Sequence, residues 1–107
     1  MLVAALCTGI GYVTVIGSGS KPPVKTISQK GRMFSVANLD ISSGETVRIV
    51  NDDADLQHHA YVESKIFSFD SGDQDPGGMT DILFSVPGTF AVLCGIHPKM
   101  KLVVNVK

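Results

Sequence analysis

The sequence contains no tryptophan, only two cysteines and three histidines, and no long segment rich in alanine, leucine, glutamate and lysine. The absence of such segments argues against a helical fold, and the many valines and glycines favour short strands and turns. The charges nearly cancel, with 9 Lys and Arg against 10 Asp and Glu, so no strong field attracts nucleic acid or an anionic membrane surface. With 107 residues and no internal repeat, the chain has room for one folded domain.

The chain begins with an uncharged, apolar segment. Residues 1–16 are apolar or small, and a Gly-Ser stretch follows at 17–20. This run is short for a membrane span, which needs roughly 20 residues, and its length suits the hydrophobic part of a secretory signal. Because no basic residue precedes it, a cleaved signal peptide and a retained membrane anchor both stay open. High β-propensity at 12–16 also leaves open a buried first strand.

We therefore divide the chain into an export signal or N-terminal membrane anchor at residues 1–20 and one folded domain at residues 21–107. This division places the domain in the periplasm or elsewhere outside the cytoplasm, either free or tethered to a membrane. A disulfide between the two cysteines is not favoured, because Cys7 lies in the apolar segment and Cys94 lies among other potential metal ligands.

From residue 24 onward, apolar and polar residues alternate in short segments that glycine and proline interrupt. Turn signals occur at Ser43-Gly44 and Pro87-Gly88, and the polar stretches 51–57 and 71–78 are expected to be loops. The pattern predicts an all-β fold, a Greek-key β-sandwich of seven to eight strands. The expected strands are 24–28, one or two within 33–42, 46–50, 58–63, a short edge strand at 67–70, 80–86, 89–94 and 100–107.

Three potential metal ligands lie close together near the end of the chain, in the segment Cys94-Gly95-Ile96-His97-Pro98-Lys99-Met100. Side chains alternate between the two faces of a strand, so every second residue shares a face. Cys94 follows apolar residues at 90 and 92, and Met100 precedes apolar residues at 102, 104 and 106. Cys94 and Met100 are therefore expected at the ends of two inward faces, with His97 on the connection between them.

A thiolate, an imidazole and a thioether at this spacing favour copper. Cysteine and methionine sulfur bind copper(I) well, imidazole binds either copper oxidation state, and a thioether is rarely a zinc ligand. A zinc site would need a further cysteine, histidine or carboxylate close by. Taken singly, each of these residues is more often part of the core or the surface, and it is their combination that predicts a site. The set still lacks a second imidazole, which either His58 or His59 can supply.

Strand alternation also chooses between these two histidines. Adjacent strand residues point to opposite faces, so both are not expected to bind the same ion. His58 shares its face with Ala60 and Val62, whereas His59 lies on the wetter face with Glu63. We therefore prefer His58 to His59. The predicted site has two histidines and one cysteine around the metal and a weak axial methionine, namely His58, Cys94, His97 and Met100.

Residues 94–100 resemble the C-x-x-H-x-x-M ligand loop of the plastocyanin and amicyanin type of cupredoxin, in its short form with proline directly after the histidine. Residues 28–35, 44–53 and 84–106 also resemble segments of that family, so the resemblance covers roughly 24–107. It implies a small blue (type 1) copper protein in which Met100 is the axial ligand. One difference stands at His59, where the family commonly has an asparagine whose amide ties the two ligand loops together.

The resemblance further implies a function. It implies one copper ion that cycles between Cu(I) and Cu(II), in a one-electron carrier that is not an enzyme and binds protein redox partners transiently. His97, flanked by Ile96 and Pro98, is expected near the surface as the place where electrons enter and leave. We expect a monomer that binds no nucleic acid and meets a membrane only through residues 1–20.

The alternative function is a periplasmic copper-binding carrier or storage protein without electron transfer. Such a protein usually has clusters of methionine or histidine, and this chain has only four methionines and three histidines. Three histidines are also too few for the second copper centre that a nitrite reductase or a multicopper oxidase domain needs.

Overall fold

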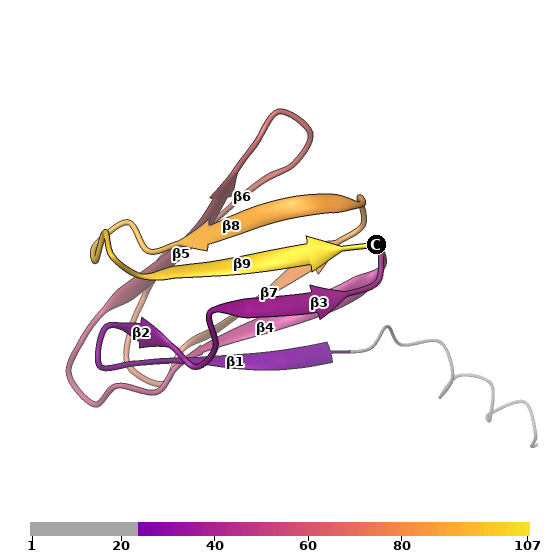
Figure 1. The fold of residues 1–107 in the computed structure, drawn as a ribbon. Coiled ribbons are helices and arrows are strands. Elements are labelled where there is room, and N and C mark those ends of the chain that lie inside the picture. Colours follow the sequence, from indigo (N-terminus) through magenta and orange to yellow (C-terminus); the bar gives the residue numbers. More distant parts are fainter. Residues whose placement is uncertain (1–23) are drawn as a thin grey trace, which may run out of the picture.

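The computed structural model describes residues 24–107, which form nine strands and no helix within that range (Figure 1). The strands are β1 (Val24–Lys30), β2 (Met33–Phe34), β3 (Asn38–Ile41), β4 (Glu45–Asn51), β5 (His58–Glu63), β6 (Ser68–Gln74), β7 (Met79–Phe84), β8 (Gly88–Leu93) and β9 (Lys101–Val106). The predicted signal or anchor at 1–20, with Cys7, lies outside the described residues. No helix in the described range is long and apolar enough to cross a membrane.

The strands form two sheets, with the order β2-β1-β4-β7 in one and β3-β9-β8-β5-β6 in the other. β1 runs parallel to β4 and β3 runs parallel to β9, while the other paired strands are antiparallel. The predicted all-β sandwich is confirmed. The described range has nine strands rather than seven to eight, because Met33–Phe34 folds back on the end of β1 as a strand of two residues.

The core between the sheets follows the alternation that the sequence predicts. In β8 and β9, Val92, Leu102 and Val104 are fully buried, whereas Lys101, the residue directly before Leu102, is exposed. Three aromatic rings, Phe67, Phe84 and Phe90, pack together with centroids 5.3, 5.5 and 5.8 Å apart. This continuous core holds the two sheets rigidly against each other, which fixes the loops at their ends.

The prediction of a loop at 71–78 is wrong for residues 71–74, which belong to β6. β6 continues to Gln74 and pairs with β5 on both sides of a register shift between His59 and Tyr61, with Gln74 opposite His58 and Asp73 opposite His59. The sequence of β6 is polar because this strand stands at the edge of its sheet, where most of its side chains meet solvent. Gln74 is the exception, since it is 5% exposed and takes part in a polar network described below.

Three connections meet at one end of the sandwich, on the left in Figure 1 and opposite the point where the chain enters β1. They are the β1–β2 turn, the connection between β4 and β5, and the connection between β8 and β9. β5 reaches the same place because Tyr61 pairs with Leu93, the last residue of β8. Segments far apart in the sequence thus bring their side chains to one end.

Candidate metal centre

The connection between β8 and β9 presents three of the predicted ligands. Cys94 follows β8 directly and Met100 precedes β9 directly, and each is 2% exposed. His97 lies between them and is half-buried. The Met100 N–H donates a hydrogen bond of 3.0 Å to the His97 carbonyl, which closes the connection into a tight turn. The inward direction predicted for Cys94 and Met100 is confirmed by their burial.

His58, the first residue of β5, completes a compact group of donors with Cys94 and His97. Its Nδ1 lies 4.0 Å from Cys94 Sγ, and His97 Nδ1 lies 3.7 Å from the same sulfur. The two imidazole rings meet edge to face, with centroids 5.0 Å apart. One ligand atom from each residue lies within 4.8 Å of the others, so these three side chains are positioned to bind one metal ion.

The environment of His97 keeps its ring available as a ligand. Loss of solvent contact lowers the pKa of His97 below its ordinary value, the nearby His58 and Arg32 act in the same direction, and Asp53 offsets part of the effect. A lower pKa means that the ring stays neutral to more acidic pH. Because only a neutral imidazole nitrogen binds a metal, Nδ1 of His97 is available over a wider pH range than in a solvated histidine.

His59 points away from this group, as strand alternation predicts. Its Nε2 lies 2.6 Å from Asp70 Oδ1 on β6, and its side chain is 22% exposed. The His59 ring also packs against Gly95, because a Cβ built on Gly95 would lie only 2.6 Å from His59 Nδ1. His59 therefore contacts the ligand connection beside Cys94, at the position where the resembling family commonly has asparagine.

This contact predicts a strong sensitivity to the size of residue 95. In Gly95→Ala, the new methyl group overlaps the His59 ring, which its bond to Asp70 holds in place. We expect the free energy of unfolding to fall by about 1–3 kcal/mol, measured by chemical denaturation. Adding His59→Ala makes room, so the double variant is expected to be more stable than the sum of the two single changes by about 1 kcal/mol. Strictly additive losses would contradict the contact.

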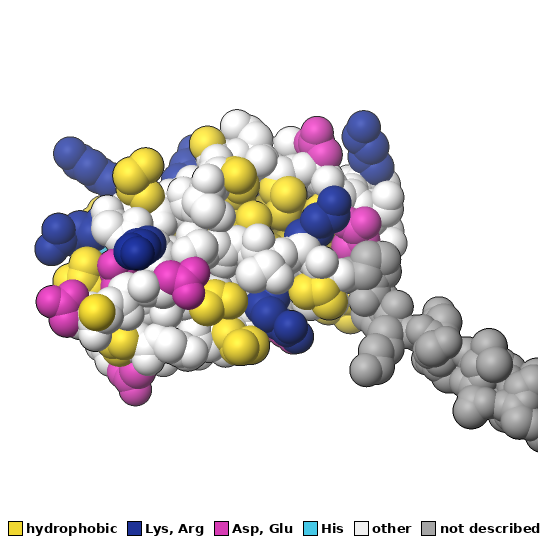
Figure 2. Space-filling model, turned by 90° about the horizontal axis from the view of Figure 1, so that it is seen from below, with side chains coloured by type: hydrophobic (Ala, Val, Ile, Leu, Met, Phe, Trp, Pro, Cys, Tyr) yellow, Lys and Arg dark blue, Asp and Glu magenta, His cyan; other side chains and the backbone are white. Residues whose placement is uncertain are grey.

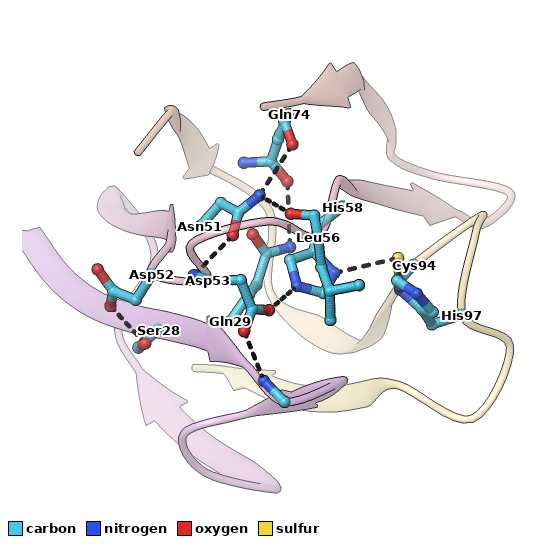
Figure 3. Close-up of polar contacts among 11 residues, drawn as sticks. Ser28, Gln29, Asn51, Asp52, Asp53, Leu56, His58, Gln74, Cys94 and His97 are labelled. Atoms are coloured by element: carbon cyan, nitrogen blue, oxygen red, sulfur yellow. Dashed lines mark hydrogen bonds and ion pairs between the residues drawn. The ribbon is translucent and has the colours of Figure 1, made fainter. Parts of the chain in front are cut away.

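Behind His58 lies a polar network that sequence reasoning missed (Figure 3). Asn51, which is fully buried, donates through Nδ2 to the carbonyls of Leu56 at 2.8 Å and Gln74 at 2.9 Å. Its Oδ1 accepts the Asp53 N–H at 3.0 Å. Gln29 Nε2 donates to Gln74 Oε1 at 3.1 Å. A polar asparagine at the end of the apolar strand 46–50 was the one signal available in the sequence.

Asp53 joins this network to the donor group. Its Oδ2 lies 2.6 Å from His58 Nε2, and its Oδ1 accepts the Gly31 N–H at 3.0 Å. The Gly31 N–H and the His58 ring lower the pKa of Asp53, so the group is a carboxylate at neutral pH. The Asp53 side chain is only 10% exposed.

Comparison with known proteins supports the fold. No protein-family model and no curated protein matches the sequence. The structure is similar to a reduced Cu(I) form of an amicyanin variant, with a TM-score of 0.71, 17% identity and coverage of 78% of this chain and 82% of that one. A second amicyanin variant in the Cu(I) form gives a TM-score of 0.71 and 17% identity, with 82% and 94% of the chains covered. The described domain has the cupredoxin fold.

The cupredoxin fold also occurs in a larger relative. A copper-containing nitrite reductase from Thermus scotoductus gives a TM-score of 0.74 and 27% identity over 100% of this chain, which spans 25% of that chain. In this domain of cupredoxin fold, the donor group of a buried cysteine and two imidazoles, with a buried methionine at the end of the same connection, fits the preferences of copper. A thioether donor suits zinc much less well.

Proposed function

We propose that the protein is a mononuclear type 1 copper protein that carries single electrons between protein redox partners outside the cytoplasm. The observation that carries this proposal is the compact group of His58, Cys94 and His97 at the closed end of a cupredoxin sandwich. Met100, buried where β9 begins, is proposed as the weak axial ligand.

Bound copper supplies a one-electron couple between Cu(I) and Cu(II), and its bond to a thiolate gives the oxidised form an intense visible absorption. The protein holds the ligands in nearly fixed positions. Cys94 and Met100 flank a tight turn between two paired strands, and the Asp53 carboxylate holds the Nε2 side of the His58 ring. Since each ligand has little freedom to move, the cost of rearrangement on gaining or losing an electron is small.

Electrons are proposed to pass through His97, the half-buried ligand. Ile96 beside it is 43% exposed and Pro98 is exposed, which together give a small apolar surface for brief contact with a partner. Arg32, Lys99 and Lys101 line a groove next to this surface, so an acidic partner face is favoured. At the left end of the view in Figure 2, Lys and Arg side chains lie beside hydrophobic and acidic ones.

The proposal places the domain in the periplasm or another extracytoplasmic space, because the apolar segment at 1–20 suits an export signal or anchor. We propose that the protein is not an enzyme. All three histidines of the chain are accounted for, two in the donor group and His59 at Asp70, which leaves none for a second copper centre. A copper carrier without electron transfer is the alternative that the following experiment separates.

Titration of the metal-free protein with copper(II), followed by visible absorption, tests the proposal. We expect one copper per chain and an intense band that a mild reductant removes and reoxidation restores. His58→Ala is expected to lose the band, whereas His59→Asn, a change next to it on the opposite face of the strand, keeps it. A protein that binds copper(I) tightly but stays colourless with copper(II) would contradict electron transfer and favour the carrier.

A further inference from the structure

Asp53 is the charged group in direct contact with the buried ligand His58. His58 has no exposed surface, and its Nε2 lies 2.6 Å from Asp53 Oδ2 (Figure 3). Its other ring nitrogen, Nδ1, faces Cys94 Sγ at 4.0 Å. Nε2 is therefore hydrogen-bonded to the carboxylate, while Nδ1 faces Cys94 and is free to bind a metal.

The position of Asp53 is set independently of His58. Its second oxygen accepts the Gly31 N–H at 3.0 Å, and its own N–H donates to Asn51 Oδ1 at 3.0 Å. Gly31 and Arg32 form the two-residue turn between β1 and β2, with positive φ values of 62° and 61° that such tight turns require. Asp53 is therefore fixed by the turn on one side and by a buried asparagine on the other, and it can orient the ring rather than follow it.

A carboxylate in this place has two consequences for the imidazole. It accepts a hydrogen bond from Nε2–H, so the neutral ring carries its hydrogen on Nε2 and leaves the Nδ1 lone pair directed at Cys94. It also places a negative charge one ring away from the donor group, in a site where only 10% of the Asp53 side chain meets solvent. Negative charge stabilises Cu(II) more than Cu(I), which favours the oxidised state.

We propose that Asp53 is a positioning residue that fixes the tautomer and orientation of His58 and, through its charge, lowers the reduction potential of the bound copper. The effect of Asp53 on the reduction potential rests on the proposed function. Its effect on the His58 tautomer concerns the metal-free protein and does not depend on that function.

The neighbouring residue offers a matched control. Asp52 carries the same charge one position earlier in the chain, is exposed, and accepts a hydrogen bond from the Ser28 hydroxyl. Asp52→Asn therefore removes one negative charge from the same loop and leaves the contact to His58 intact. In Asp53→Asn, the amide has one acceptor oxygen in place of two, so it cannot accept from both Gly31 and His58.

The first measurement is the reduction potential of the copper-loaded protein, by spectroelectrochemical titration. In Asp53→Asn we expect the affinity for Cu(II) to fall about tenfold relative to Cu(I), which raises the potential by about 59 mV. Asp52→Asn is expected to shift the potential much less. Equal shifts of the potential in the two variants would overturn the proposal, because the contact of Asp53 with His58 would then have no effect beyond that of any nearby surface charge.

The second measurement needs no copper. Nitrogen-15 NMR of the imidazoles in the metal-free protein reports which nitrogen of His58 carries the hydrogen. We expect Nε2 in the unchanged protein and in Asp52→Asn, and a mixture of both tautomers in Asp53→Ala. A pure Nε2 tautomer in Asp53→Ala, with the fold intact by NMR, would overturn the positioning role. If the unchanged protein shows the Nε2 tautomer but no blue copper band, the proposed function fails while the positioning of His58 by Asp53 stands.

Discussion

Cys94→Ser is expected to abolish the intense visible band of the copper-loaded protein. The serine hydroxyl stays protonated at neutral pH and offers copper a hard oxygen in place of a soft thiolate, so both the absorption and most of the copper(I) affinity depend on this sulfur. Cys94 Sγ is also the atom that both imidazoles face, at 4.0 and 3.7 Å. We expect the copper affinity to fall by more than about 100-fold, because changes to residues that only hydrogen-bond to a metal ligand already cost up to about 100-fold.

Visible absorption and a competition titration with a copper(I) chelator measure the two effects of Cys94→Ser. Cys7→Ser is the matched control, because it makes the same chemical change in the apolar segment at the start of the chain. It is expected to keep the band and the affinity. Circular dichroism of metal-free Cys94→Ser checks that the buried hydroxyl leaves the fold intact. A full-strength band in folded Cys94→Ser would rule out a thiolate-copper site at this position.

Asn51→Ala is expected to produce the largest loss of stability among the polar residues around the site. The change removes three hydrogen bonds at once and leaves the carbonyls of Leu56 and Gln74 and the Asp53 N–H without their partner. Each buried group left without a partner costs about 1–3 kcal/mol, so we expect the free energy of unfolding to fall by at least about 3 kcal/mol. The same change frees residues 52–57, which connect β4 to His58, and so we also expect weaker copper binding.

Chemical denaturation of the metal-free protein measures this loss. Asn105→Ala is the matched control, since Asn105 accepts from Thr89 Oγ1 and donates to Asp40 Oδ1 in a half-buried position. There, water can replace the lost partners, and we expect a loss below about 1 kcal/mol. If the two alanine variants lost equal stability, the buried network around Asn51 would not contribute as its geometry indicates.

Alternation along β5, β8 and β9 was enough to predict which side chains face inward. Cys94 and Met100 face inward because they continue the apolar faces of β8 and β9, and His58 faces inward with Ala60 and Val62. The direction of a side chain on a strand depends on the local backbone and has a period of two, so these faces could be predicted without knowledge of the fold. The choice of His58 over His59 followed from the same rule.

The length of β6 shows where such reasoning fails. Ser71–Gln74 has few apolar residues, and its extended shape comes from pairing with His58 and His59 on β5. A strand whose side chains mostly meet solvent has no apolar alternation to reveal it. The burial of Gln74 depends in turn on Gln29, which is distant in sequence and lies across the sandwich on β1.

The all-β class, the inward direction of Cys94, Met100 and His58, and the spacing that favours copper therefore follow from local sequence pattern. The contact of Asp53 with His58 and the packing of His59 on Gly95 follow from the tertiary fold alone. Alternation and turn preferences act between neighbours in the chain, whereas these contacts depend on how the β1–β2 turn, the β4–β5 connection and β6 come together. Such contacts form only when the two sheets close on a common core.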